Sequence, residues 1–334
     1  MRAVLRTPLP LALAASLLAL APAPGAAQSP VRSVRVEADN DAFNFWVPVP
    51  RPDHDYTHGA RVVVDADRAP GWGRLLHPGL RPCTGAEGAE ERCLATRWEV
   101  GQKIYTPRRD APDPLPGERP YAGWLYAGAT ARVAGRAAER TLGVEVGVTG
   151  RPSLGEAFQQ SLHRLAGFWR PEGWGNQLAF EPGVVLRYGG ARLLAEPRTA
   201  EGVRVATLAP EWGAALGNVL TGAHAGLRAR AGYGVPHPWG AGGAGEARPP
   251  VAVYAVAAVR GEWVARSLFL DGNTFRDSPR VERLPVVGEY EVGGGVRVRD
   301  LRLEYRVVAR GREYRSEPDA HRWSTISVSW QPPR

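Results

Sequence analysis

One histidine on a short predicted helix is the strongest candidate for acid–base chemistry in this chain. Residues 155–163 read as a helix, whereas the segments around them read as β-strands. Gln159 and His163 are four positions apart, so they lie on the same face of such a helix. A neutral imidazole at this position can take a proton from water. The alternative is that the helix only closes a loop and that His163 is an ordinary surface or core residue.

Oxygen-bearing side chains gather where the first two predicted strands meet. Asn40 and Asp41 end the first strand, and Thr57 lies at the start of the second. Because consecutive antiparallel strands are hairpin partners, we expect these three residues to share one rim. Amide, carboxylate and hydroxyl oxygens are the hard ligands that Ca²⁺ prefers. The pattern therefore predicts a Ca²⁺ site with Asp41 and Asn40 as metal ligands.

Arginines dominate the connection that follows the third strand. Arg108, Arg109 and Arg119 lie there, and Lys103, within the strand, is the only lysine of the chain. The planar guanidinium fork binds oxyanions in a bidentate manner. We expect these arginines to bind the phosphate groups of a ligand.

The elements that must position these residues follow a period of two. In residues 141–149, for example, Leu142, Val144, Val146 and Val148 alternate with polar residues and glycine. The same alternation occurs in residues 33–39, 57–65, 125–133, 178–188, 223–233, 251–263, 290–298, 301–310 and 325–330. A soluble sandwich also alternates, but it rarely places Arg and Glu repeatedly on one face. The pattern predicts an all-β, transmembrane antiparallel β-barrel of about 12 strands, with a short helix in an extracellular loop.

The lengths of the connections assign the two ends of this barrel. If the first strand runs outward, four long connections fall on the outer side: residues 42–56, 106–120, 150–176 and 268–285. The candidate residues for chemistry all lie in or beside them. Short turns at 135–138 and 299–300 fall on the inner side, together with two longer segments, 71–97 and 234–250. We therefore predict that the site lies at the outer end.

The N-terminus has the features of a secretory signal. Arg2 and Arg6 precede an apolar run, residues 9–21, that is too short to span a bilayer, and small residues at 25–27 suit cleavage. We predict a signal peptide over residues 1–27 and a single outer-membrane barrel domain over residues 28–334. No later stretch has the length and apolarity of a membrane helix.

Charge and cysteine content limit the classes of function. The formal net charge is +8, but the charges are spread over alternating strands, which argues against nucleic-acid binding. Cys83 and Cys93 are the only cysteines, and in an exported protein we expect them to form a disulfide that closes a small loop. We assign them no catalytic or metal-binding role.

Taken together, these motifs resemble the outer-membrane lipid A 3′-O-deacylase family. The resemblance runs from Asn40-Asp41 to the motif Gly-Asn-Thr-Phe-Arg-Asp at residues 272–277. It implies a twelve-stranded barrel and a Ca²⁺-dependent esterase that removes an acyloxyacyl chain from lipid A. It also implies catalytic roles for His163, Asn40 and Thr57, with Asp41 and Asn40 at the metal. Gln159, one turn before His163, is then expected to bind substrate.

The sequence departs from the family pattern at one position. The family has an essential lysine in the loop that here spans residues 108–119, which contains no lysine and has Pro112 at the counted position. We expect Arg108 or Arg109 to supply that charge. In the implied mechanism, His163 activates water and Ca²⁺ stabilises the oxyanion. Ser161 is an unlikely nucleophile, because residues two apart on a helix point away from each other.

Three other functions fit a barrel of this kind. An outer-membrane phospholipase would share the Ca²⁺ and the ester chemistry, but it would use a serine nucleophile. A passive pore or structural barrel would have no chemistry, and a degenerate enzyme would bind lipid A without cutting it. The partner that we predict for the membrane-embedded barrel is lipid A or lipopolysaccharide of the outer leaflet, and the sequence implies no protein partner.

Overall fold

The computed structural model describes residues 31–43, 54–67, 71–76, 78–83, 92–240 and 247–332. The predicted signal peptide, residues 1–27, lies outside the described residues. Within the described part, no helix is both long enough and apolar enough to cross a lipid bilayer.

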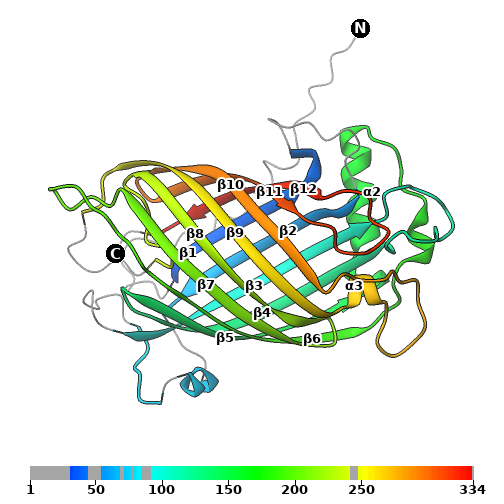
Figure 1. Ribbon diagram of the computed structural model, residues 1–334, viewed down its shortest axis with the longest axis horizontal. Coiled ribbons are helices and arrows are strands. Elements are labelled where there is room, and N and C mark those ends of the chain that lie inside the picture. Colours follow the sequence, from blue (N-terminus) through cyan, green and yellow to red (C-terminus); the bar gives the residue numbers. More distant parts are fainter. Residues whose placement is uncertain are drawn as a thin grey trace, which may run out of the picture.

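Twelve antiparallel strands form a closed barrel in which each strand pairs with its neighbours in sequence and β1 closes on β12 (Figure 1). The strands are β1 Val31–Asn40, β2 Asp55–Ala66, β3 Cys93–Thr106, β4 Ala122–Ala134, β5 Ala138–Thr149, β6 Pro182–Arg192, β7 Ala206–Gly217, β8 Leu220–Tyr233, β9 Val251–Ser267, β10 Val286–Val298, β11 Leu301–Arg310 and β12 His321–Trp330. The predicted fold class and strand number are confirmed.

The alternation read from the sequence separates the two faces of the wall. In β10, Tyr290 and Val292 are more than half exposed on the outer face, whereas Glu291 between them is buried inside. Glu291 lies 3.1 Å from Arg306 of β11, and Arg306 lies 3.3 Å from Glu37 of β1. Burying a charge is costly unless it is paired. The inward charges therefore form ion-pair networks that link strands across the interior.

One end of the barrel carries α2 (Gly155–Ala166), α3 (Leu268–Asp271) and the connections β3–β4, β5–β6 and β9–β10, whereas the connections β2–β3, β6–β7 and β8–β9 lie at the other end (Figure 1). The four connections predicted for the outer side all begin and end at the helical end, and residues 44–53 of the first lie outside the described residues. The connection between β11 and β12, residues 311–320, joins them and was not among the predicted loops. The outer end therefore has one long connection more than the sequence pattern predicted.

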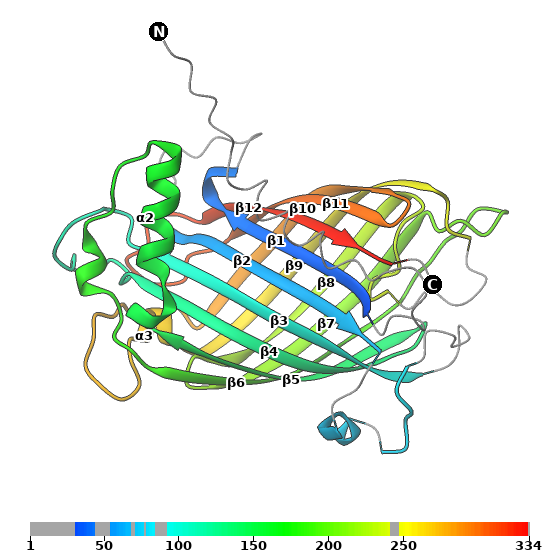
Figure 2. The same cartoon turned by 180° about the vertical axis from the view of Figure 1, so that it is seen from behind.

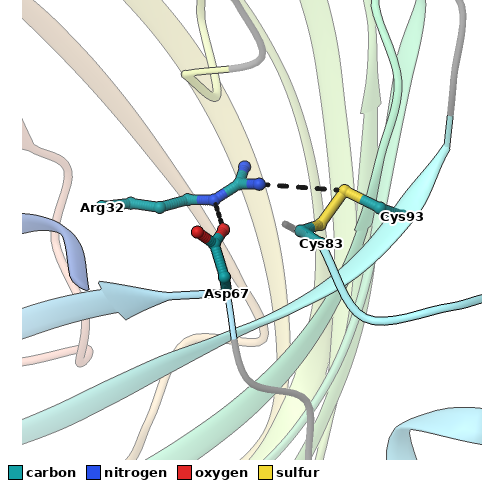
Figure 3. Close-up of a disulfide and its surroundings, with 4 residues drawn as sticks. All are labelled: Arg32, Asp67, Cys83 and Cys93. Atoms are coloured by element: carbon teal, nitrogen blue, oxygen red, sulfur yellow. Dashed lines mark hydrogen bonds and ion pairs between the residues drawn. A yellow bond between two sulfur atoms is a disulfide. The ribbon is translucent and has the colours of Figure 1, made fainter. Parts of the chain in front are cut away.

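The opposite end holds the disulfide. Cys83 and Cys93 are bonded, as predicted, with a Cα–Cα distance of 4.8 Å. Arg32 forms an ion pair with Asp67, and its guanidinium lies 3.8 Å from the sulfur of Cys93 (Figure 3). The disulfide thus fastens the connection between β2 and β3 beside the start of β1, far from α2.

Candidate active site

The predicted oxygen cluster forms at the outer rim of β1 and β2. Asn40 pairs with His58 in the register of the two strands, and the Asn40 amide donates to the Thr57 carbonyl at 3.2 Å. The Asn40 side-chain oxygen accepts the backbone N–H of Ala42 at 2.8 Å. Asp41 is fully buried. The structure therefore brings Asn40, Asp41 and Thr57 together, as the hairpin argument predicts.

Backbone contacts hold this rim in place. One carboxylate oxygen of Asp41 accepts the backbone N–H of His54 at 3.1 Å, which ties both ends of the connection between β1 and β2. The Thr57 hydroxyl lies 2.6 Å from the hydroxyl of Thr106, at the end of β3. All of these side chains are buried. The rim is thus a defined arrangement of oxygen atoms over three strands.

This cluster lies on the outer, lipid-facing side of the wall. Asn40, His58, Ile104 and Gly123 are consecutive partners across β1 to β4. Residues two apart in a strand share a face, and Val100, four positions before Ile104, is 58% exposed on the outside. The row therefore continues the outer surface of the barrel toward its rim.

Helix α2 covers this row from outside. The Phe158 ring stacks on His58 with centroids 4.6 Å apart, and the Gln102 amide donates to the Ser153 carbonyl at 2.6 Å. At Gly123 an added Cβ would lie 2.1 Å from the Ser153 hydroxyl and 3.3 Å from the Gly155 Cα. Only glycine lets helix and wall approach this closely. Figure 2 shows α2 beside the outer ends of β2 and β3.

Local sequence determines where the helix begins and ends. Leu154 precedes it in a left-handed conformation (φ 59°), and Gly167 ends it with φ 76°, where glycine carries no Cβ penalty. Glu156 lies in the first turn, where a negative charge is favourable against the helix dipole. The predicted helix is therefore confirmed, and it extends three residues beyond His163.

The two polar residues singled out on α2 contact the segment that follows the helix. His163 and Gln159 are both buried. The Nδ1 of His163 lies 2.6 Å from the Trp169 carbonyl, to which it can only donate, so Nε2 is the basic nitrogen of the neutral ring. Gln159 accepts the indole N–H of Trp174 at 2.8 Å. Gln159 therefore binds the segment that follows α2, and this bond uses its side-chain oxygen.

A neighbouring stripe of α2 is apolar. Phe158, Leu162 and Leu165 follow this stripe, with exposed fractions of 39%, 39% and 60%. A helix on the surface of a soluble protein buries its apolar face. In α2 only Phe158 packs on the wall, whereas Leu162 and Leu165 remain exposed, and this arrangement suits an apolar environment around the outer rim.

The connection between β3 and β4 supports the segment that returns from α2. Asp110 accepts the Tyr121 hydroxyl at 2.6 Å and the backbone N–H of Glu172 at 3.0 Å. Residues 107, 109, 111 and 113–121 also line a cavity of about 280 Å³ with residues 173, 176, 279 and 280. Arg109, Arg119 and Arg280 are the basic residues that line this cavity.

The three predicted phosphate-binding arginines lie in different environments. Arg109 is 64% exposed, and its Nε donates to Glu118 at 2.9 Å. Arg108 is partly exposed, and its guanidinium lies 3.5 Å from Asp319. Both can reach a ligand at the surface of the outer loops.

Arg119 does not share that position. It is buried, lies 3.0 Å from Glu313 and 3.7 Å from Asp55, and covers the Tyr105 ring at 4.7 Å. Burial alone would lower its pKa, but the carboxylates of Glu313 and Asp55 hold the pKa of the guanidinium above its usual value. Arg119 therefore stabilises the interior of the outer loops, and it does not face a phosphate at the surface.

Sequence reasoning missed Glu181, which joins three outer connections. Its carboxylate accepts the backbone N–H of Thr274 at 2.7 Å and the amides of Asn273 and Asn218 at 3.1 and 2.8 Å. Burial would raise the pKa of Glu181, but these hydrogen bonds hold it below its usual range. The Gly-Asn-Thr motif at 272–274 was the part of this contact visible in the sequence, and the structure shows that Asn273 and Thr274 donate hydrogen bonds to Glu181.

Comparison with known proteins gives one strong likeness. The family described as outer membrane protein LpxR matches residues 11–332. The solved structure of LpxR from Salmonella typhimurium aligns with a TM-score of 0.73 at 19% identity, covering 90% of this chain and 100% of that one. The β domain of the Bordetella autotransporter BrkA aligns with a TM-score of 0.44 at 9% identity, covering 90% and 99%. No curated protein sequence matches the chain.

Proposed function

The chain belongs to the LpxR family of outer membrane proteins, and from this premise we propose that it is an esterase that removes an acyloxyacyl chain from lipid A. The family expected from the motifs and the outer-membrane location are thereby confirmed. The substrate, the cofactor and the catalytic residues are our proposal, and the following geometry supports them.

The position of His163 is the observation that carries the proposal. His163 is a buried residue of α2, and this helix packs through Phe158 on the outer face of the wall. A substrate that stays in the outer leaflet can reach this face laterally, without entering the barrel. The exposed stripe of Phe158, Leu162 and Leu165 offers an apolar surface for its acyl chains.

In the proposed mechanism His163 acts as general base. Its Nδ1–H bond to the Trp169 carbonyl orients the ring and leaves the lone pair on Nε2. Nε2 takes a proton from water, and the water oxygen attacks the ester carbonyl to form a tetrahedral intermediate. When the intermediate collapses, His163 returns the proton to the departing alkoxide. The products are an acyloxyacyl carboxylic acid, which keeps its secondary ester, and a lipid A with a free hydroxyl group where that unit was attached.

The oxygen donors at the rim fit Ca²⁺. A buried carboxylate and a neighbouring amide are hard ligands, and neither a sulfur nor an imidazole nitrogen is among the residues proposed to hold the ion. Asp41 and Asn40 would hold the ion, with Thr57 ordering the rim through its hydroxyl contact to Thr106. When bound, Ca²⁺ would supply positive charge to stabilise the oxyanion.

Arg108 and Arg109 are the proposed contacts to the phosphates of the glycolipid. Both lie on the connection that packs against the segment after α2, and Arg109 lines the outer cavity. They supply the positive charge that the family pattern places on a lysine. Arg119 is not among the proposed phosphate contacts, because its guanidinium is buried and already paired with the carboxylates of Glu313 and Asp55.

Mass spectrometry of lipid A tests this function. The purified protein is incubated in mixed micelles with lipid A, with Ca²⁺ or with a chelator, and His163→Ala serves as the inactive control. We expect loss of one acyloxyacyl unit only with Ca²⁺ and only in the parent protein. Unchanged lipid A with a folded barrel would refute the proposal, and cleavage of glycerophospholipid instead would identify a phospholipase.

A further inference from the structure

A second group of metal-binding side chains lies on the inner side of the same rim. His54, Asp55 and His321 are all buried. One nitrogen of each imidazole and one carboxylate oxygen of Asp55 lie within 4.8 Å of one another. None of these residues has a role in the chemistry proposed above. The group combines two nitrogen donors with one oxygen donor, which is a different set from that of Asp41 and Asn40.

His321 is oriented as a metal ligand. Its Nε2 lies 3.0 Å from the Tyr56 carbonyl, which can only accept a hydrogen bond. In the neutral ring the lone pair is therefore on Nδ1, which is buried and has no hydrogen-bond partner among the described residues. Metal-bound histidines commonly donate their second ring nitrogen to a backbone carbonyl in this way. A buried polar atom without a partner is otherwise costly.

The other two side chains are held beside it. Nδ1 of His54 lies 2.8 Å from a carboxylate oxygen of Asp55, and the His54 and His321 ring centroids are 5.0 Å apart. Asp55 has a positive φ of 61°, which is unusual for a residue other than glycine. Its second oxygen accepts the Tyr314 hydroxyl at 3.1 Å. The backbone strain at Asp55 is thus offset by contacts that aim its carboxylate inward.

The group links two strands that are not paired with each other. His321 begins β12 and Asp55 begins β2, and both strands flank β1. His321 pairs with Arg310, whose guanidinium points into the barrel toward Glu262 and Glu289. The group therefore lies at the outer mouth of the lumen, across the wall from α2.

We propose that His54, Asp55 and His321 form a site for a divalent transition-metal ion of the zinc class, separate from the Ca²⁺ site. Two imidazoles and one carboxylate are a known zinc ligand set, and imidazole donors favour Zn²⁺ over Ca²⁺. Binding requires the imidazole nitrogens that face the ion to be deprotonated, and any proton displaced goes to solvent. The ion connects β2 and β12 above the end of β1. Since the His54 backbone N–H also binds Asp41, the ion braces the rim that carries Asp41.

Calorimetric titration of the metal-free protein in detergent with Zn²⁺, with Ca²⁺ in excess, tests this site. We expect one equivalent of Zn²⁺ to bind and the unfolding temperature to rise. His321→Gln keeps an N–H donor for the Tyr56 carbonyl but lacks the ring lone pair. We expect it to weaken binding by more than about tenfold, since even second-shell changes cost 10–100-fold.

Two matched variants locate the ion. His237→Gln changes a buried histidine in the connection between β8 and β9 at the opposite end, and His163→Gln changes the histidine of α2. We expect both to bind Zn²⁺ like the parent protein. Absence of Zn²⁺ binding in the parent, equal binding by His321→Gln, or loss of binding in His163→Gln would each overturn the proposal. None of these readouts depends on esterase activity.

Discussion

The ring of Phe158 stacks on the ring of His58, with centroids 4.6 Å apart and an interplanar angle of 29°. This contact joins the covering helix α2 to the row of residues that begins at Asn40. His58 is buried beneath it, whereas Phe158 is 39% exposed. The stack therefore fastens α2, the helix that carries His163, to the outer face of the wall.

Removing this stack should loosen α2 and leave the barrel folded. An aromatic pair contributes roughly 0.5–1.5 kcal/mol beyond its buried area, so we expect Phe158→Ala to lower deacylation by about tenfold, because His163 is then less well positioned. Initial rates on lipid A measure the effect. Phe180→Ala, which changes a 56% exposed phenylalanine in the same connection, serves as the control. Equal rates for both variants would contradict this role.

The close contact between helix and wall predicts a strong effect of one methyl group. In Gly123→Ala the new Cβ would lie 2.1 Å from the Ser153 hydroxyl and 3.3 Å from the Gly155 Cα. We expect the helix to shift outward and activity to fall by at least about tenfold, since a shift of 1 Å can cost 10²-fold. In Gly261→Ala, on β9, the added atom meets nothing within 4 Å. That control should keep parental activity, and the heat-dependent gel mobility of both variants should report a folded barrel.

The two environments of the arginines predict opposite phenotypes. Arg109→Gln should raise KM for lipid A several-fold with little change in stability, because the exposed guanidinium is proposed to bind phosphate. Arg119→Gln should instead lower the free energy of unfolding by about 1–3 kcal/mol, because the buried carboxylate of Asp55 loses a cationic neighbour, while Glu313 keeps its ion pair with Arg310. Enzyme kinetics and urea unfolding separate the two effects. An unchanged KM in Arg109→Gln would remove Arg109 from the substrate site.

Glu317 predicts a dependence of stability on pH. It is buried in the connection between β11 and β12, where its carboxylate accepts the backbone N–H of Glu313. Burial and the negative charges of Asp55 and Glu313 raise its pKa to about 8, while Arg119 and the backbone hydrogen bond oppose the rise. The folded protein therefore holds a proton that the unfolded chain releases above its ordinary pKa.

The sign follows directly from that difference in bound protons. Because the folded pKa is raised, this group lowers the free energy of unfolding as pH rises from the unfolded pKa to about 8. The slope is at most about 1.4 kcal/mol per pH unit. We expect Glu317→Gln to be more stable than the parent at pH 8 and about equal to it at pH 4. Urea unfolding in metal-free buffer at both pH values measures this, and a parallel pH profile of the two proteins would show that Glu317 does not titrate as expected.

The sequence by itself determined the barrel and the location of the rim. Alternation in segments such as 141–149 and 301–310 reports which residues meet an apolar surface and which do not, and this information is local. The helix at His163, the disulfide of Cys83 and Cys93, and the meeting of Asn40 with Thr57 followed from short-range pattern and hairpin pairing. The motifs were likewise sufficient to identify the family.

Only the tertiary structure decided which side of the wall each candidate faces. A shift of one residue moves a strand side chain to the other face, so Asn40 could be placed outside and Asp39 inside only by the register of β1 with β2. Arg119 reads like Arg109 in sequence, yet its partner Glu313 is 194 residues away. His54 and His321 meet only because β12 closes on β1. Contacts between distant segments depend on the closure of the whole sheet, and no local pattern records them.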